Sequence, residues 1–246
     1  MISEIKKLSQ SYMEYKRKKT EHALLFKNFT SDFEKYNSIA SQHQKASKEF
    51  LYPCLFDKTQ QTNIEPIYFY QDAWAFERIV SERPSNHIDI GSHHKFVALL
   101  SKITNLSMVD LRPLSLEMNS INFIKGDILN LPFENESIDS LSSLCVIEHI
   151  GLGRYGDTLD PGGSEKAFNE IARILKIGSN FYMSVPVEEV NKVYFNAHRA
   201  FNEDFLLNEL LRNYQVFDRK YIYGNQFLSE KKNGWGVGCY HLRKIR

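Results

Sequence analysis

The chain has 246 residues, 42% of them hydrophobic and 13% aromatic, so it is long enough to bury a sizeable core. Its formal net charge of +1 argues against a dedicated nucleic-acid binder. No apolar run approaches about 18 residues and the first residues lack the apolar core of a signal peptide, which predicts a cytoplasmic protein without a transmembrane segment. Cys54, Cys145 and Cys239 lack C-x-x-C spacing, so we expect reduced thiols and no metal site.

Residues 1–50 are predicted to form a helical N-terminal arm. This arm carries ten Lys and Arg against six Asp and Glu, whereas the rest of the chain is slightly acidic. Its apolar residues keep the spacing of one helix face, namely Ile5, Leu8, Tyr12, Tyr15, Phe26, Phe29, Phe33, Tyr36 and Ala40. One long helix would satisfy this pattern, but a capping box of Ser31 and Glu34 would instead start a second helix near Asn28. We expect the apolar face either to dock on its own domain or to form a homodimer.

A linker and lid segment is expected over residues 51–85. Pro53 and the polar run DKTQQTN at 57–63 are typical of a linker. The aromatic residues that follow could cover a cleft or belong to the core, and they are Tyr68, Phe69, Tyr70 and Trp74.

Residues 86–246 alternate between strand and helix patterns. Strands are predicted at 86–92, 107–113 and 121–127, then in the segment ending CVIEHI, and at 180–187 after an amphipathic helix. Two further strands, 214–224 and 235–244, predict an antiparallel hairpin. The fold class is therefore α/β, with a doubly wound, mainly parallel, seven-stranded sheet.

The ends of the predicted strands carry the residues with chemical potential. Such sheets bind ligands at the carboxyl ends of their strands. Asp110 lies 21 residues after Asp89, a spacing that suits a carboxylate accepting both ribose hydroxyls of a nucleoside. Alone, this spacing is also compatible with a simple turn residue.

Residues 86–187 resemble a class I S-adenosylmethionine (SAM) dependent methyltransferase. The similar segments are DIGS, GDILNLPFENESIDSLSS and AFNEIARILKIGSNFYMSVP. More narrowly, YFYQDAWAFERI, VDLRP, SLCVIEHIGLGRYGDTLDP and FNAHR resemble an uncharacterised family, the 268th domain-of-unknown-function family, over about residues 65–243. This resemblance implies SAM as cofactor and a role in surface-polysaccharide biosynthesis. The cofactor-binding residues that it implies are Asp89, Gly91, Ser92, Asp110, Asp127, Ile128 and Cys145.

The cofactor loop departs from the G-x-G-x-G pattern of typical methyltransferases. Only Gly91 remains, and His93 and His94 occupy the following positions. These histidines could narrow the cofactor pocket, donate to an anionic group, or simply be exposed.

The acceptor site is expected where the fourth and fifth strands end. Either His149 or His198 could act as general base, with a carboxylate such as Glu148 or Asp157 to orient it. The acceptor would be bound by residues of the two following loops, namely Arg154, Tyr155, Asp157, Asn196 and Arg199. A structural ion pair between Arg199 and Asp157 is the competing interpretation.

These patterns predict SAM-dependent methyl transfer to a small or sugar-type acceptor. The alternative is a protein of the same fold that binds a nucleotide-sugar or glycan without methylating it, because its cofactor loop has lost glycines.

Overall fold

The computed structural model describes residues 2–246, with side chains from residue 11 onward, so the predicted contacts of Ile5 and Leu8 lie outside the described residues. The chain divides into two units, Met1–Asn63 and Ile64–Arg246. The division expected from the sequence, at residues 50 and 85, stays a prediction. In the described residues, no helix combines the length and the apolar character needed to cross a membrane.

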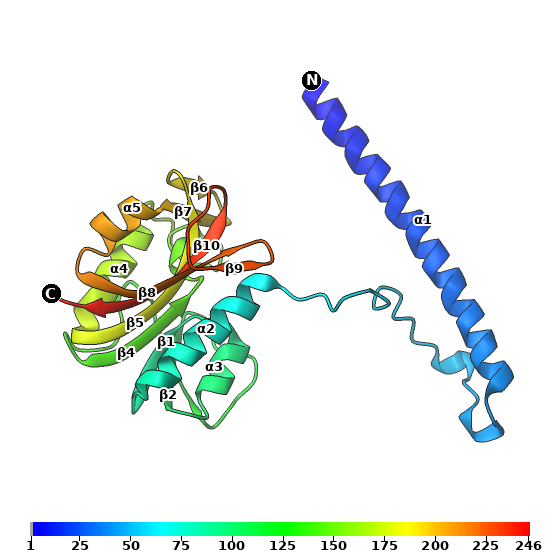
Figure 1. Cartoon of the computed structure of the whole chain (residues 1–246), viewed down its shortest axis with the longest axis horizontal. Coiled ribbons are helices and arrows are strands. Elements are labelled where there is room, and N and C mark those ends of the chain that lie inside the picture. The colour runs from blue at the N-terminus through cyan, green and yellow to red at the C-terminus, as the bar shows by residue number, and fades with distance from the viewer. Residues whose placement is uncertain (1) are drawn as a thin grey trace. The chain divides into compact units, whose positions relative to one another are not determined.

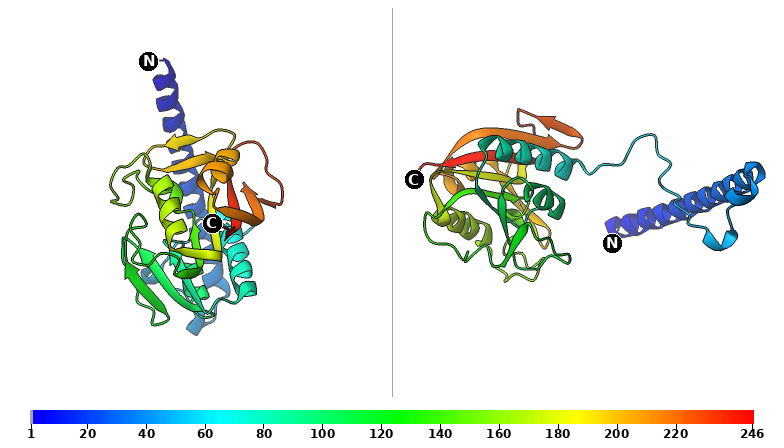
Figure 2. Two further views of the ribbon diagram at one scale, coloured as in Figure 1. Left: turned by 90° about the vertical axis from the view of Figure 1, so that its left-hand side faces the viewer. Right: turned by 90° about the horizontal axis from the view of Figure 1, so that it is seen from below.

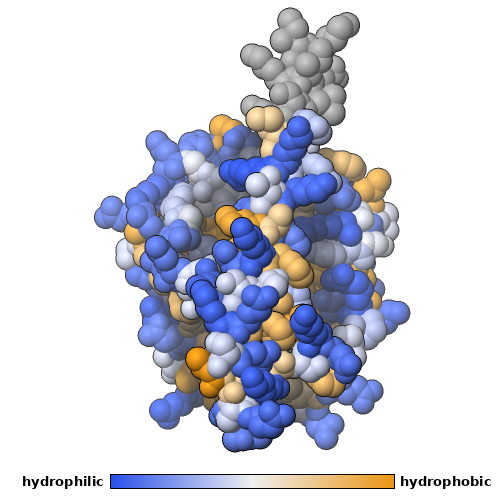
Figure 3. Space-filling view, turned by 90° about the vertical axis from the view of Figure 1, so that its right-hand side faces the viewer, coloured by the Kyte–Doolittle hydropathy of each residue, from blue (hydrophilic) through white to orange (hydrophobic). Residues whose placement is uncertain are grey.

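The first unit is dominated by one long helix, α1 (Ile2–Ile39), drawn in blue in Figure 1. The helix continues through Ser31 and Glu34, so the interpretation with one long helix is confirmed. Two 3₁₀ turns follow at Gln42–Gln44 and Lys48–Phe50. Large side chains of α1 stay exposed, among them Tyr12, Tyr15, Leu24 and Phe26. Mostly hydrophilic side chains with scattered hydrophobic ones cover the face of the molecule shown in Figure 3.

The second unit contains the mixed sheet that the sequence predicts. Its strands are β1 (Asn86–Ile90), β2 (Asn105–Asp110), β3 (Ile121–Lys125), β4 (Ile138–Leu144), β5 (Leu175–Glu188), β6 (Lys192–Tyr194), β7 (His198–Asn202), β8 (Tyr214–Tyr223), β9 (Gln226–Leu228) and β10 (Gly236–Lys244). The order is β3-β2-β1-β4-β5-β10-β8-β9, and β7 pairs with both β5 and β6. The seven expected strands are all present, and β6, β7 and β9 are short additions.

The first five strands of this order run parallel, and β10 enters antiparallel between β5 and β8. This gives a Rossmann-like α/β fold with a C-terminal antiparallel hairpin. The chain leaves β1 in one direction along the sheet and β4 continues in the other, so the topological switch point lies between these strands. Ligands of doubly wound sheets bind at that point.

Helices cover both faces of the sheet, as the two views of Figure 2 show. On one face lie α2 (Pro66–Glu82) and α3 (His94–Leu100), which bury Trp74, Ile79 and Phe96. On the other lies α4 (Gly163–Ile174), which buries Phe168 and Ile171. The short helical segments η3 (Ile147–His149), α5 (Glu203–Phe205) and η4 (Leu206–Leu210) complete the unit. Because both faces are covered, only the sheet edges and loops remain to form a site.

Candidate active site

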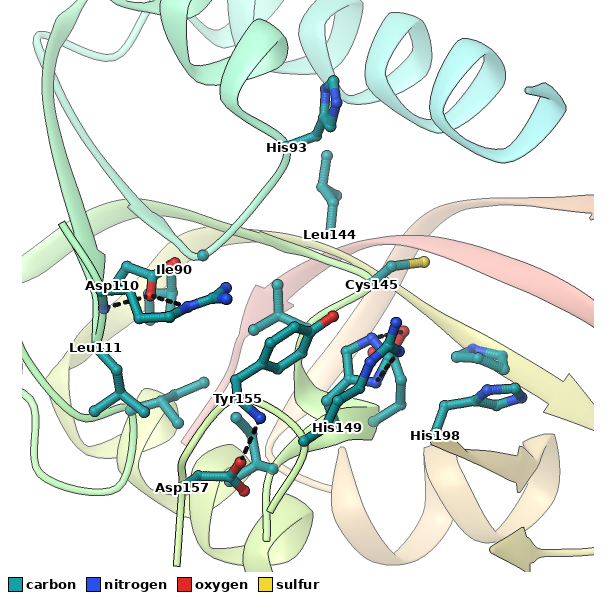
Figure 4. A pocket seen from close by; sticks show the side chains of 18 of the residues that line it. Ile90, His93, Asp110, Leu111, Leu144, Cys145, His149, Tyr155, Asp157 and His198 are labelled. Carbon is teal, nitrogen blue, oxygen red and sulfur yellow. Dashed lines mark hydrogen bonds and ion pairs between the residues drawn. The ribbon is translucent and has the colours of Figure 1, made fainter. Parts of the chain in front are cut away.

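A cavity of about 300 Å³ opens at the carboxyl ends of β1, β2 and β4. This is the size of a small-molecule pocket. Figure 4 shows residues that line it, from Ile90 and Asp110 on one side to His149 and His198 on the other. This placement agrees with the sequence prediction that the residues after the first strands and the two histidines lie at one edge of the sheet.

Gly91 and Asp110 form the end of the cavity nearest β2. Gly91 has a φ of +65°, and a Cβ there would lie 3.1 Å from Cγ1 of Val146 and 3.7 Å from Oδ2 of Asp110. Glycine therefore both relieves strain and leaves room in the cavity. Oδ1 of Asp110 accepts a hydrogen bond from the backbone N–H of Arg112 at 2.9 Å, which fixes the carboxylate at the strand end.

Three other residues predicted to bind the cofactor are not among those lining the cavity. Asp89 and Ser92 are buried behind the loop: the Ser92 N–H and the Ser142 hydroxyl both donate to the Asp89 carboxyl. Burial raises the pKa of Asp89 to about 6. Asp127 accepts from the N–H of Leu129, so it shapes the turn. Its neighbour Ile128 does line the cavity.

His93, at the position of a loop glycine, is turned away from the centre of the cavity in Figure 4. Its ring packs at a tilt against Tyr68 of α2 with 4.7 Å between centroids, and its Nδ1 lies 3.8 Å from Oδ2 of Asp72. The imidazole thus packs against α2, and Tyr68 covers part of the cavity.

Cys145 lines the cavity just beyond β4, with a φ of +52°. Its thiol donates to Oε1 of Gln71 at 3.2 Å, and burial raises the pKa of the thiol well above its usual range. At neutral pH the Cys145 thiol therefore stays protonated, so it lines the cavity without acting as a nucleophile.

His149 lies in η3 and has its tautomer fixed by the backbone. Its Nδ1 is 2.6 Å from the carbonyl oxygen of Ala197. A carbonyl oxygen only accepts, so Nδ1 carries the proton and Nε2 keeps its lone pair. Burial lowers the pKa of His149 to about 4, which leaves the ring neutral.

His198, at the start of β7, has the opposite arrangement. The indole N–H of Trp235 donates to its Nε2 at 3.3 Å, and an indole can only donate. The neutral ring therefore uses its basic nitrogen to accept this bond. Tyr194 packs on the ring, with 4.9 Å between centroids, and holds it in place.

Glu148 precedes His149 and is 1% exposed. Its Oε1 lies 3.7 Å from Nε2 of His149. Burial raises the pKa of Glu148 to about 8, whereas that of His149 is lowered, so at neutral pH the two side chains are neutral neighbours and no ion pair.

The glycine-rich loop after η3 is held by Asp157. Its carboxylate accepts hydrogen bonds from the N–H groups of Gly151, Gly153 and Tyr155. Tyr155 thereby faces the cavity, as Figure 4 shows. The guanidinium group of Arg199 bonds to other groups, so the competing interpretation, an ion pair between Arg199 and Asp157, does not hold.

Two arginines contact the ring of Tyr155 at the cavity. The guanidinium carbons of Arg112 and Arg154 lie 4.5 and 5.0 Å from its centroid. Arg154 also donates to the carbonyl oxygen of Ala197 at 3.2 Å, so it joins the loop to the segment before β7.

Two residues predicted to bind the acceptor are not among those lining the cavity. Arg199 is 8% exposed and donates to the carbonyl oxygens of Ile150, Asp160 and Pro161. It therefore stabilises the loop from within. Asn196 is exposed, with a φ of +60° in the turn before β7.

The sequence interpretation missed Arg112, Ile67 and Trp235 as cavity residues. Arg112 follows Asp110 by two positions, so the strand end could have indicated it. Trp235 and Ile67 are distant in sequence from the motifs, and no local pattern marks them.

Comparisons with known proteins agree with this architecture. Residues 116–230 match the family described as "Caenorhabditis protein of unknown function, DUF268". The matched region is less than half of the chain. It includes η3, the Asp157 loop and β7, whereas Gly91 and Asp110 lie before it. A search of curated proteins found no match.

Solved structures share the fold at low sequence identity. The N-methyltransferase NodS from Bradyrhizobium japonicum WM9 has 13% identity and a TM-score of 0.56, covering 75% of this chain and 100% of NodS. NodS in complex with S-adenosyl-L-homocysteine (SAH) has 13% identity and a TM-score of 0.53, covering 88% and 98%. The [4+2]-cyclase SpnF has 14% identity and a TM-score of 0.52, covering 71% and 81%. Identities this low show the fold alone.

Proposed function

We propose that the protein is a SAM-dependent methyltransferase that acts on a hydroxyl group of a small or sugar-type acceptor. The observation that carries the proposal is the free Nε2 of His149, fixed by the carbonyl oxygen of Ala197, in the same cavity as Asp110. Surface-polysaccharide biosynthesis is the setting that the family resemblance adds.

The residues at the β1 and β2 ends fit SAM. Asp110 would accept the ribose hydroxyls, because its carboxylate stands at the strand end beside a glycine with no Cβ to fill the space. Gly126 and Ile128 would enclose the base. His93 does not oppose this fit, because its ring packs on Tyr68. The loss of loop glycines is therefore compatible with cofactor binding.

His149 is the general base of this proposal, and His198 is a positioning residue. Nε2 of His149 can take a proton from an acceptor hydroxyl, whereas Nε2 of His198 already accepts from Trp235. When bound, SAM supplies an activated methyl group: the acceptor oxygen gains the carbon, the sulfur keeps the electron pair of the broken bond, and the hydroxyl proton goes to His149. Positioning of the two reactants accounts for most of the rate enhancement.

Arg154 and Arg112 favour an acceptor that carries an anionic group. Both guanidinium groups contact Tyr155 at the cavity, and neither makes a close bidentate pair with a carboxylate. A nucleotide-linked or acidic sugar supplies the phosphate or carboxylate oxygens that guanidinium groups bind.

The experiment is a calorimetric titration of SAH into the full chain, followed by transfer of a radiolabelled methyl group from SAM to nucleotide-sugars. SAH binding in the micromolar range and label in one sugar class would support the proposal. Absence of SAH binding at millimolar concentration would refute it.

The alternative function is binding of a nucleotide-sugar or glycan without methyl transfer. The similarity to SpnF keeps this alternative open only in that the fold also occurs in a protein that is not described as a methyltransferase. If this protein bound a nucleotide-sugar but neither SAM nor SAH, the result would support the binding function over methyl transfer.

A further inference from the structure

Glu148 is a buried acid without a partner for one of its oxygens. It is 1% exposed and lines the cavity. Its Oε2 has no hydrogen-bond partner among the residues that the structure describes. A buried carboxylate without donors is costly, so the carboxyl group keeps its proton at neutral pH. The raised pKa of Glu148, about 8, agrees with this geometry.

The groups around Glu148 leave its charge state open to a ligand. The elements around Glu148 are α2, the end of β4, η3, the following loop and β7. Their titratable or charged side chains are Tyr68, Cys145, His149, Arg154, His198 and Arg199. The buried residues of α4 include no titratable side chain. Arg154 favours ionisation, but burial outweighs it. An additional positive charge in the cavity would reverse this balance.

The proposed function places such a charge near Glu148, and the present inference rests on it. An acceptor oxygen that donates to Nε2 of His149 lies about 3 Å from that nitrogen, and the reacting methyl carbon lies about 3–3.5 Å further. Oε1 of Glu148 is 3.7 Å from the same nitrogen. The sulfur lies one bond beyond that carbon, so it is within roughly 12 Å of the carboxyl group. At an effective dielectric constant of about 20, a unit charge at that range shifts the ionisation equilibrium roughly tenfold or more.

We propose that Glu148 responds to the charge on the cofactor sulfur. It releases its proton to solvent when the sulfonium form binds, and it takes a proton back from solvent once methyl transfer has produced the neutral thioether. SAM, which carries a positive charge on its sulfur, then binds beside an ionised Glu148, whereas SAH binds beside a neutral Glu148. The carboxyl group thus favours the substrate form of the cofactor over the product form, which promotes exchange after each turnover.

The test counts the protons that each ligand releases on binding. SAM and SAH are titrated into the full chain at pH 7 in two buffers with different ionisation enthalpies, and the difference in heat gives the number of protons. SAH shares the amino acid and the nucleoside with SAM, so proton exchange by those parts cancels. We expect SAM to release roughly 0.4 proton beyond SAH, because a roughly tenfold shift brings the pKa of Glu148 from about 8 to near the pH of the titration.

Two variants assign the proton. Glu148→Gln keeps the shape of the protonated acid, and it should abolish the difference between SAM and SAH. His149→Gln should retain the difference, because His149 is neutral in both states. A difference that persists in Glu148→Gln would overturn the inference.

A pH series on the wild type gives a test that needs no variant. Binding of a cation favours the ionised acid, so the affinity for SAM relative to SAH should rise roughly tenfold from pH 6 toward pH 9 and level off above about pH 8. A ratio that stays constant would overturn the inference while leaving the methyltransferase proposal intact. Failure of both ligands to bind would refute the methyltransferase proposal itself.

Discussion

Nδ1 of His149 lies 2.6 Å from the carbonyl oxygen of Ala197, which joins the turn after β4 to the segment before β7. This contact links two sequence motifs separated by 48 residues. It also settles which ring nitrogen carries the proton, because a carbonyl oxygen cannot donate.

A first prediction separates the two histidines. His149→Gln should reduce methyl transfer roughly 10²–10⁴-fold, because it removes the nitrogen that accepts the hydroxyl proton. His198→Gln should reduce it less than tenfold, since Nε2 of His198 already accepts from Trp235. Initial rates measure the effect, and SAH affinity should change less than threefold in both variants. Equal losses in the two variants would contradict the assignment.

A second prediction concerns the ribose. Asp110→Asn should weaken SAH binding roughly 10–100-fold, because the bound hydroxyls lose a charged acceptor. Asp127→Asn is the matched control: Asp127 holds the N–H of Leu129 and is not among the cavity-lining residues, so SAH affinity should change less than threefold. Calorimetry compares the two. A larger loss of SAH affinity in Asp127→Asn than in Asp110→Asn would contradict the placement of the ribose at Asp110.

A third prediction distinguishes the two arginines of the acceptor loops. Arg199→Met should lower the free energy of unfolding by about 3 kcal/mol, because it leaves buried carbonyl oxygens without donors. Arg154→Met should lower it by less than about 1 kcal/mol, since Arg154 is exposed. Urea denaturation measures both values. Comparable stability of the Arg199 variant and the wild type would show that the loop holds without this residue.

A fourth prediction concerns acid stability. His87 is buried between the hydroxyls of Ser140 and Ser142, and burial lowers its pKa to about 3. A lowered folded-state pKa gives stability that is present above the unfolded pKa of about 6.5 and is lost as the pH falls toward 3. Relative to His87→Gln, the wild type should lose about 1.4 kcal/mol for each pH unit between about 6 and 4. Parallel pH curves for the two proteins would contradict this.

A fifth prediction concerns the N-terminal unit. A chain that begins at Ile64 should fold, because the ten strands and the two buried clusters that the structure describes lie beyond that residue. If α1 forms a homodimer through its exposed aromatic side chains, sedimentation should give a dimer for the full chain and a monomer for the truncated one. The same oligomeric state for both chains would argue against dimerisation through α1.

The sequence by itself determined the sheet. Each of the first three predicted strands has a run of apolar residues ended by glycine or an acidic residue, and these local signals survive folding because they reflect burial and turn geometry. The strand containing Asp89, the strand ending at Asp110 and the antiparallel hairpin all formed as expected. So did the placement of His149 and His198 around one cavity.

Only the tertiary structure decided what the side chains do there. Arg199 is one residue from His198, yet alternate residues of a strand point to opposite faces, so Arg199 bonds buried carbonyls while His198 lines the cavity. Trp235 reaches His198 from the far end of the chain. Protonation likewise depends on three-dimensional burial. Glu148 and His149 are both neutral because the folded chain removes them from water, and the spacing of residues in the sequence does not show this.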